Sequence, residues 1–402
     1  MNNGDTAWVL TSSAFVFIML PGLAFFYGGL VRNKNVLATI MHSFMALAII
    51  GIVWVLWGYS LAFGPSWQGI IGSLEWFGLQ GVSATATGPY SDTIPHQAFM
   101  IFQAKFAIIT PALIAGAFAE RIKFKAFVLF IILWSTLVYA PAAHWMWGVG
   151  GWLADWGAKD FAGGAVVHLT SGVAAISAAL VFGKRMGLGK ESMEPHNISY
   201  IVLGAGLLWF GWFGFNGGSA LAANGTAVSA FVVTHISAAV ATCTWVMIDW
   251  FLKGKPSVVG AATGAIAGLA TITPAAGFVG PMPAMLIGFA AGALCYSAVY
   301  VKNKMQLDDS LDVFAVHGMG GIIGLISVAL LGGIGFMSLA EITDLSRGDF
   351  LIRQLGAIGA IAAWSFGITT IILLALKNTV GLRVTSEEEE IGLDLSEHGE
   401  TA

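Results

Sequence analysis

Charged side chains are scarce in this chain of 402 residues. Only 10% of its residues are Asp, Glu, Lys or Arg, against roughly 25% in an average soluble domain. The formal net charge is -4 and no basic patch is present, which argues against nucleic acid as a partner. Hydrophobic residues make up 57% of the chain, and its mean hydropathy is +0.81. This composition indicates a polytopic membrane protein.

Cysteines and metal-binding spacings are also scarce. Cys243 and Cys295 both lie in apolar runs, so we expect two small core residues and no disulfide or thiolate metal site. The 8 histidines show no His-x-x-His or His-Glu-x-x-His spacing, and no Gly-x-Ser-x-Gly motif occurs. The sequence therefore predicts no metal, no cofactor and no enzymatic activity.

Long apolar runs dominate what is present. A hydrocarbon layer of about 30 Å needs roughly 20 apolar residues per helix. The first run is too long for a signal-peptide core, so we interpret it as a span. Eleven stretches qualify, near residues 8–31, 36–63, 98–119, 124–142, 162–183, 197–215, 227–252, 258–279, 283–301, 313–333 and 350–376.

The positions of lysine and arginine predict the orientation of these spans. Most of them fall at alternate connections, beginning with Arg32 and Lys34 and continuing with Arg121 to Lys125. Positive charge is enriched in cytoplasmic loops. We therefore expect the N-terminus outside, the C-terminus in the cytoplasm, and a multi-pass protein of the cell membrane.

Two histidines occur in matching contexts in the two halves of the chain. His168 follows Asp160 by eight positions, and His317 follows Asp309 at the same spacing. Phe25 to Gly29 is echoed in the same way by Phe213 to Gly218. Five helices per half would invert the second copy, because an odd number of crossings reverses it. The pattern predicts inverted repeats of about 8–185 and 197–333, with an eleventh helix at 350–376.

Buried ionisable groups inside a membrane point to function. Two neutral imidazoles in contact can share one hydrogen bond and offer their remaining groups to a small guest. We expect His168 and His317 to form such a pair, and His235 to be a core histidine bonded to a carbonyl. Asp160 is interpreted as a helix cap that accepts from the N–H groups of residues 161 to 164.

Glycine is abundant, with 52 residues. Gly260, Gly264 and Gly268 share one helical face, which favours close helix packing over a moving hinge. The last segment, residues 377–402, is polar and cannot span, and residues 387 to 390 are all glutamate. It is either a solvated tail or, as Gly381 to Val384 suggests, a tail that docks on the cytoplasmic face.

Several motifs together are similar to the signature of the ammonium transporter family, which includes methylammonium permeases and Rhesus proteins. The resemblance is closest to the microbial ammonium transporters and covers nearly the whole chain. It implies eleven helices in a five-plus-five inverted repeat and a homotrimer with one pore per subunit. The motifs are Pro21-Gly22, Phe26 to Gly29, Gly116 to Arg121, Ala143 to Gly148, Asp160 to Arg185, Gly211 to Ser219, Thr273 to Gly277, Val316 to Gly318 and Val380 to Val384.

The resemblance also assigns roles to residues of this sequence. It implies recruitment of ammonium outside, a pair of rings that closes the pore, a twin-histidine pore, and a tail that docks a P-II-type signalling protein. The assignments are Phe102, Phe106, Trp147 and Ser219 for recruitment, Phe106 and Phe215 for the gate, His168, His317 and Trp212 for the pore, Asp160 for structure and transport, and Arg383, Gly392 and Asp394 for the tail.

The implied function is transport of ammonium or methylammonium, with a proton lost near the gate and ammonia crossing the pore. Whether the proton follows separately, making transport electrogenic, stays open. Lys105 is a charge at a position that is usually uncharged in the family, and it either snorkels outward or repels ammonium in the vestibule. The alternative functions are an ammonium sensor that conducts little and an intramembrane hydrolase with histidine as its base.

Overall fold

The computed structural model describes all 402 residues as a bundle of helices with four short strands. The long helices are α1 (Asn3–Leu30), α2 (Val36–Val53), α4 (His96–Ile114), α5 (Phe124–Trp134), α8 (Thr170–Phe182), α9 (Ile198–Gly218), α10 (Gly225–Lys253), α11 (Val258–Ile272), α12 (Pro281–Lys304), α13 (Met319–Leu331) and α15 (Arg347–Thr379). The shorter helices are α3 (Tyr59–Phe63), α6 (Ala140–Trp147), α7 (Trp152–Asp155), α14 (Leu339–Ile342), α16 (Ser386–Ile391) and α17 (Leu393–His398).

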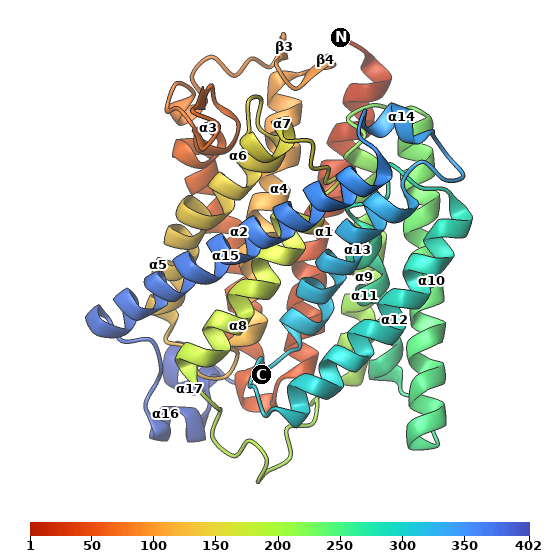
Figure 1. The fold of residues 1–402 in the computed structure, drawn as a ribbon. Coiled ribbons are helices and arrows are strands. Elements are labelled where there is room, and N and C mark those ends of the chain that lie inside the picture. Colours follow the sequence, from red (N-terminus) through yellow and green to blue (C-terminus); the bar gives the residue numbers. More distant parts are fainter.

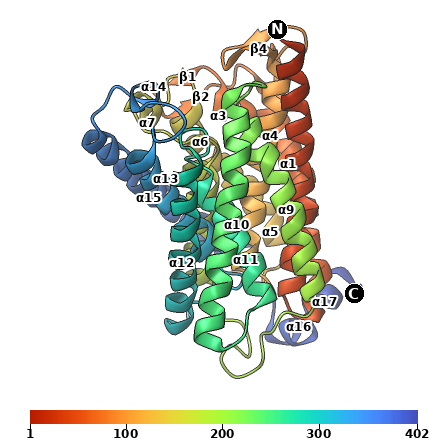
Figure 2. The same cartoon turned by 90° about the vertical axis from the view of Figure 1, so that its right-hand side faces the viewer.

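The two chain ends lie at opposite ends of the bundle (Figure 1). The N-terminus shares its end with two small antiparallel hairpins, and α16 and α17 lie at the other end. α15 crosses the bundle obliquely, while α1, α9 and α10 stand side by side (Figure 2). The hairpin strands are β1 (Ser66–Trp67), β2 (Ile71–Gly72), β3 (Thr87–Gly88) and β4 (Ser91–Pro95).

Ten helices are long and apolar enough to cross a membrane. The stretch predicted at 258–279 is shorter, because α11 ends at Ile272 and residues 273 to 278 form turns. Pro274 explains this end, since proline has no N–H to donate and clashes with the preceding helical turn. The chain is thus a polytopic helical protein of ten such helices and one shorter apolar helix.

Four of the membrane helices contain a π-helical turn, in which one extra residue widens the helix. These turns lie at η2 (Trp54–Gly58), η5 (Ser135–Tyr139), η6 (Gly164–Leu169) and η7 (Phe314–Gly318). η6 precedes α8 and carries His168, and η7 precedes α13 and carries His317. The two histidines therefore share a local backbone form as well as a sequence context.

Glycines let α10 and α11 approach closely. A Cβ atom at Gly264 would lie 2.7 Å from Cβ of Trp245, and one at Gly268 would lie 2.6 Å from the carbonyl oxygen of Ser237. Real Cβ atoms do not approach so closely, so this face of α11 accepts only glycine. The prediction of tight helix packing is confirmed for this stripe.

The expectation that both cysteines lie in the core is correct for one of them. Cys295 is buried, whereas Cys243 is exposed on the outer face of α10. An apolar run on a membrane helix does not distinguish a lipid-facing side from a buried side, because both are apolar. The two thiols are free.

The tail docks on the rest of the chain. The N–H of Lys123 donates to Leu382 O at 2.9 Å, and the N–H of Val384 donates to Arg121 O at 3.1 Å. Further along, Asp394 Oδ1 accepts from the N–H of Ala38 at 2.8 Å. Of the two forms predicted for residues 377–402, the structure adopts the docked one.

The packing at α11 leads to a stability prediction. We expect Gly264→Leu to lower the free energy of unfolding by about 2 kcal/mol, because the new side chain forces α10 and α11 apart. Thermal unfolding in detergent measures the change. Gly206→Leu is the matched control, since no atom lies within 4 Å of the Cβ position there. Equal midpoints for the two variants would contradict the packing argument.

Candidate functional site

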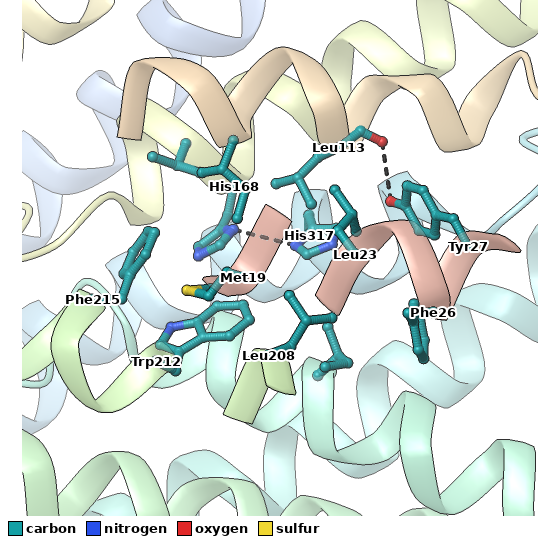
Figure 3. Close-up of a pocket in the computed structure, with 13 residues that line it drawn as sticks. Met19, Leu23, Phe26, Tyr27, Leu113, His168, Leu208, Trp212, Phe215 and His317 are labelled. Carbon is teal, nitrogen blue, oxygen red and sulfur yellow. Dashed lines mark hydrogen bonds between the residues drawn. The ribbon is translucent and has the colours of Figure 1, made fainter. Parts of the chain in front are cut away.

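A small cavity lies in the middle of the bundle (Figure 3). Its volume is about 10 Å³, and 11 of its 13 lining residues are hydrophobic. His168 and His317 are the two exceptions. A cavity needs at least about 10–15 Å³ to hold one water. This central chamber therefore has room for no more than one molecule of that size.

The two histidines meet at this chamber. Nδ1 of His168 lies 3.2 Å from Nδ1 of His317, and the ring planes differ by 18°. One nitrogen must donate and the other accept, so the two neutral rings have opposite protonation at Nδ1. Both rings are buried, and Nε2 of His168 has no hydrogen-bond partner. An unpaired buried nitrogen is costly, and here it borders a cavity of molecular size.

The backbone around each histidine is fixed by an aspartate that precedes it. Asp160 accepts from the N–H groups of Gly163, Gly164, Ala165 and Val166 at 2.7–3.2 Å. These donors lie two residues further along than predicted, because Gly163 adopts φ 118 and η6 begins only at Gly164.

The second aspartate, Asp309, also accepts from the backbone at the start of a histidine-bearing helix, but from fewer N–H groups than Asp160. Oδ2 of Asp309 accepts from the N–H of Phe314 at 2.7 Å, at the first residue of η7. The N-terminal end of each histidine-bearing helix thus has a carboxylate near its unpaired N–H groups, where negative charge is stabilised. The two aspartates, which have the same spacing to their histidines in the sequence, thus also have similar positions in the structure.

Two aromatic rings in close, tilted contact lie at one end of the chamber. The ring centroids of Phe106, from α4, and Phe215, from α9, are 4.3 Å apart. Phe215 also stacks on His168 at 5.9 Å. Figure 3 shows Phe215 and Tyr27 at opposite ends of the row, with the histidines between them. Phe215, with Phe106 against it, thus lies at the end of the chamber opposite Tyr27.

Further aromatic and hydroxyl groups surround the outer face of this pair. Trp147 meets Phe106 edge-on at 5.9 Å, and Phe102 does so at 5.0 Å. Trp147 Nε1 donates to Asp160 O, which fixes the indole. The hydroxyl of Ser219 donates to Phe215 O at 2.8 Å, so its oxygen lone pairs stay free to accept.

The structure adds wall residues that the sequence analysis did not identify. Met19, Leu23 and Tyr27 line the chamber from α1, and Leu208 lines it from α9 beside Trp212. Trp212 is anchored by its Nε1, which donates to Thr273 Oγ1 at 2.9 Å. The sequence did contain a sign of the α1 residues, because positions 19, 23 and 27 are four residues apart and so share one helical face.

Two polar residues lie away from the chamber. Nζ of Lys105 is 5.5 Å from the ring of Phe17, which is half exposed on the outer surface of α1, so this amine does not face the pore. His235 was predicted to be a buried histidine bonded to a carbonyl, and this is wrong. It is exposed on α10, where its ring contacts Trp209 at 5.5 Å.

A buried ion network lies at the end of the bundle where the tail docks. Glu120 accepts from the N–H of Arg32 at 2.7 Å and pairs with Arg185 at 3.3 Å. Burial alone would raise the pKa of Glu120, but Arg185 and Arg32 outweigh burial and hold this pKa below its usual value. The same balance, with Arg121 and Arg185 as partners, lowers the pKa of Asp308. Both carboxylates are therefore ionised at neutral pH.

The three tail residues identified from the sequence make contacts with this end of the bundle. Arg383 donates to Phe182 O at 3.0 Å and to Glu389. Gly392 adopts φ 107, and a Cβ there would lie 2.5 Å from Cβ of Lys34. Only glycine fits this position, which directs Asp394 toward α2.

The fold and the chamber define a class of protein: a polytopic helical membrane protein with a small, mostly apolar cavity at its centre, where two buried histidines meet. A profile of the Ammonium Transporter Family matches residues 7–402. The chain belongs to this family, and it is a multi-pass protein of the cell membrane.

Named relatives match over the full length. The chain is 50% identical to "Ammonium transporter" of Bacillus subtilis, covering 100% of this chain and 99% of the relative. It is 48% identical to "Ammonium transporter Amt1" of Archaeoglobus fulgidus, with full coverage of both.

Solved structures agree in fold. The crystal structure of Saccharomyces cerevisiae Mep2 has a TM-score of 0.88 and 37% identity, covering 96% of this chain and 91% of that one. A structure described as "Sensor Amt Protein" has a TM-score of 0.91 and 30% identity, covering 98% of each chain.

The carboxylate of Asp160 leads to a second stability prediction. Asp160→Asn replaces an acceptor oxygen by an NH₂ donor that faces backbone N–H groups, so we expect a loss of about 2 kcal/mol in the free energy of unfolding. Asp92→Asn is the control, because Asp92 is exposed. Thermal unfolding compares the two, and an unchanged midpoint for Asp160→Asn would contradict the role given to this carboxylate.

Proposed function

We propose that this chain transports ammonium by conducting ammonia through its central chamber. The observation that carries the proposal is the pair of neutral imidazoles in a dry cavity behind a closed aromatic gate. The names of the relatives at 48–50% identity support the same substrate. Methylammonium, a slightly larger cation of the same chemistry, is the expected second substrate.

Recruitment takes place outside the gate. Trp147 and Phe106 supply ring faces that attract a cation, a contribution of about 2 kcal/mol once water is removed. The free lone pairs of Ser219 accept an N–H, and Phe102 packs the wall. Sodium and potassium have no N–H groups to donate, so the hydroxyl favours ammonium over them.

Crossing requires the loss of charge. An ammonium ion without its water would lose several kcal/mol in the apolar chamber, whereas ammonia would not. Ammonium gives one proton to water on the outer side of Phe106 and Phe215, and the electrons of that N–H bond remain as the lone pair of ammonia. Ammonia then passes His168, His317 and Trp212 and takes up one proton on the far side. The net charge of the protein is therefore the same before and after each crossing.

The assembly and topology complete the proposal. Eleven crossings, with a five-plus-five inverted repeat, place the N-terminus outside and the tail in the cytoplasm. Family membership supports a homotrimer with one pore per subunit. The docked tail, with Arg383, Gly392 and Asp394 at its contacts, is the proposed binding face for a P-II-type signalling protein.

A second function is favoured by one observation. The structure described as "Sensor Amt Protein" shares the fold at a TM-score of 0.91. A sensor would bind ammonium at the same outer site and conduct little. Flux therefore separates the two functions.

The transport proposal predicts a change of selectivity when the histidines are replaced. In proteoliposomes we expect ammonium flux for the unmodified chain and altered discrimination between ammonium and potassium for the double variant His168→Asp, His317→Ala. A carboxylate in the chamber favours a cation, whereas the imidazole pair favours a neutral guest.

Flux is measured by a pH-sensitive dye, and current is recorded in parallel to separate electrogenic from neutral transport. Cys243→Ser, on the outer face of α10, is the control. Unchanged flux and ion discrimination in the double variant would remove the histidines from the mechanism. Ammonium binding without flux in the unmodified chain would favour the sensor.

The proposed role of the tail predicts a second functional change. We expect deletion of residues 383 to 402 to change the rate of ammonium flux at least twofold, because it removes the contacts of Arg383, Glu389 and Asp394 with the bundle. Deletion of residues 399 to 402 is the control, since it keeps those contacts. Identical kinetics for both truncations would contradict a regulatory tail.

A further inference from the structure

A second cavity adjoins the central chamber on the side away from the gate. Its volume is about 230 Å³, far more than the roughly 10–15 Å³ that one water needs. The two cavities share Phe26, Tyr27, Ile266 and His317 in their walls. We call this larger space the inner vestibule. It lies directly behind His317 and is large enough to hold several waters.

The walls of the inner vestibule differ chemically from those of the chamber. Thr263, Ser310 and Asp312 bring two hydroxyl groups and one carboxylate, whereas the polar groups of the chamber are the two imidazoles, the Trp212 indole N–H and the Tyr27 hydroxyl. The hydroxyl of Tyr27 is already bonded to Leu113 O at 3.0 Å (Figure 3). A space with oxygen acceptors and a negative charge suits a cation rather than a neutral molecule.

Asp312 is held in an unusual backbone conformation. Its φ is 60, in the left-handed region that few residues other than glycine adopt, although Asp and Asn tolerate it best. Its N–H donates to Asp309 O, and its carbonyl accepts from the N–H of Val316, one residue before His317. The turn that places this carboxylate in the vestibule is thus continuous with the helix that carries the histidine.

One lysine partly neutralises the carboxylate. Nζ of Lys302 lies 2.6 Å from Asp312 Oδ1 and also donates to Asp309 O at 2.9 Å. Oδ2 of Asp312 makes no hydrogen bond within the protein, and the side chain is 29% exposed. One oxygen is therefore paired with the lysine, and the other is available to a guest in the vestibule.

We propose that the inner vestibule is a second ammonium site, on the side of the pore opposite to Trp147, with Asp312 as its charged acceptor. The inference rests on the proposed transport of ammonium. Oδ2 of Asp312 accepts an N–H from the cation, and the rings of Phe26 and Tyr27 supply apolar faces that attract it. Ammonium arriving from the tail side binds there, gives one proton to water on the tail side, and enters the chamber past His317 as ammonia.

Lys302 sets the strength of this site. A lone carboxylate would hold a cation more tightly and retard its release, while the nearby ammonium group of Lys302 offsets part of the charge. A conducting pore needs binding that permits entry and still allows exit. Removal of the carboxylate and removal of the lysine are therefore expected to act in opposite directions.

The test measures the ammonium concentration that gives half-maximal flux, separately from each side of the membrane. Vesicles are sorted by whether the tail is accessible from the external medium, and flux is read with an internal pH-sensitive dye. For entry from the tail side we expect Asp312→Asn to raise this concentration about threefold and Lys302→Met to lower it. Entry from the opposite side changes by less.

The substitution Asp312→Asn keeps the left-handed turn, because Asn tolerates that conformation as Asp does. Glu194→Gln is the matched control, since Glu194 is an exposed carboxylate on the neighbouring loop between Lys190 and α9. Its replacement tests whether surface charge alone changes the half-maximal concentration. If Glu194→Gln raised the half-maximal concentration as much as Asp312→Asn does, the proposed site would be wrong.

In Asp312→Asn the vestibule loses a carboxylate, and Lys302 also loses its ion-pair partner. The double variant Asp312→Asn, Lys302→Met removes the unpaired lysine and so shows the effect of the lost carboxylate alone. A half-maximal concentration that stays above that of the unmodified chain supports the site, and a return to the unmodified value overturns it. Flux in the unmodified chain with no difference in any Asp312 variant would also overturn it, while leaving the transport proposal intact. Absence of flux from both sides would instead contradict transport itself.

Discussion

The contact between the Nδ1 atoms of His168 and His317 joins two helices, although the two histidines are 149 residues apart in the chain. Glycines make this contact possible. A Cβ atom at Gly172 would collide with the backbone of Gly318, and one at Gly321 would lie 2.5 Å from Gly164 O. The two helices therefore meet backbone to backbone beside the imidazoles. In a bilayer such close packing replaces the hydrophobic drive that lipid cannot supply.

The two cavities that adjoin this contact differ in size and in the chemistry of their walls. The chamber where the helices meet has a volume of about 10 Å³, and the inner vestibule behind His317 has a volume of about 230 Å³. The charged groups follow the same division. Glu120, Arg185 and Asp308 pair at the tail end of the bundle, and no Asp, Glu, Lys or Arg lines the chamber. The glycine contacts thus accompany the smaller, mostly apolar cavity, and the paired charges lie at the tail end of the bundle.

Much of this arrangement could be predicted from the sequence. The equal spacing of Asp160 to His168 and Asp309 to His317 identified the pair, because it is a relation along one chain. The positions of the spans also followed from apolar length. The sequence could not show which residues of other helices pack against each helix face.

The errors show this limit in physical terms. His235 and Cys243 both point outward from α10, and lipid and core are equally apolar, so hydropathy gave no sign of it. The N–H donors to Asp160 are displaced because Gly163 adopts a left-handed conformation that delays the helix. Asp312 gave no sequence signal either, because its importance depends on a cavity formed by α1, α11 and the loop before η7.

The docked tail supplies hydrogen-bond acceptors to two helices of the bundle. Asp394 accepts from the N–H of Ala38 and Glu397 from the N–H of Phe124, in the first turns of α2 and α5. Neither helix has an acidic residue of its own in that turn, so the tail supplies the missing negative charge. Water can replace these acceptors when the tail leaves, so each contact contributes only about 1 kcal/mol. The docked tail therefore completes the N-terminal caps of α2 and α5, and these two contacts hold it against the end of the bundle where Glu120 and Arg185 pair.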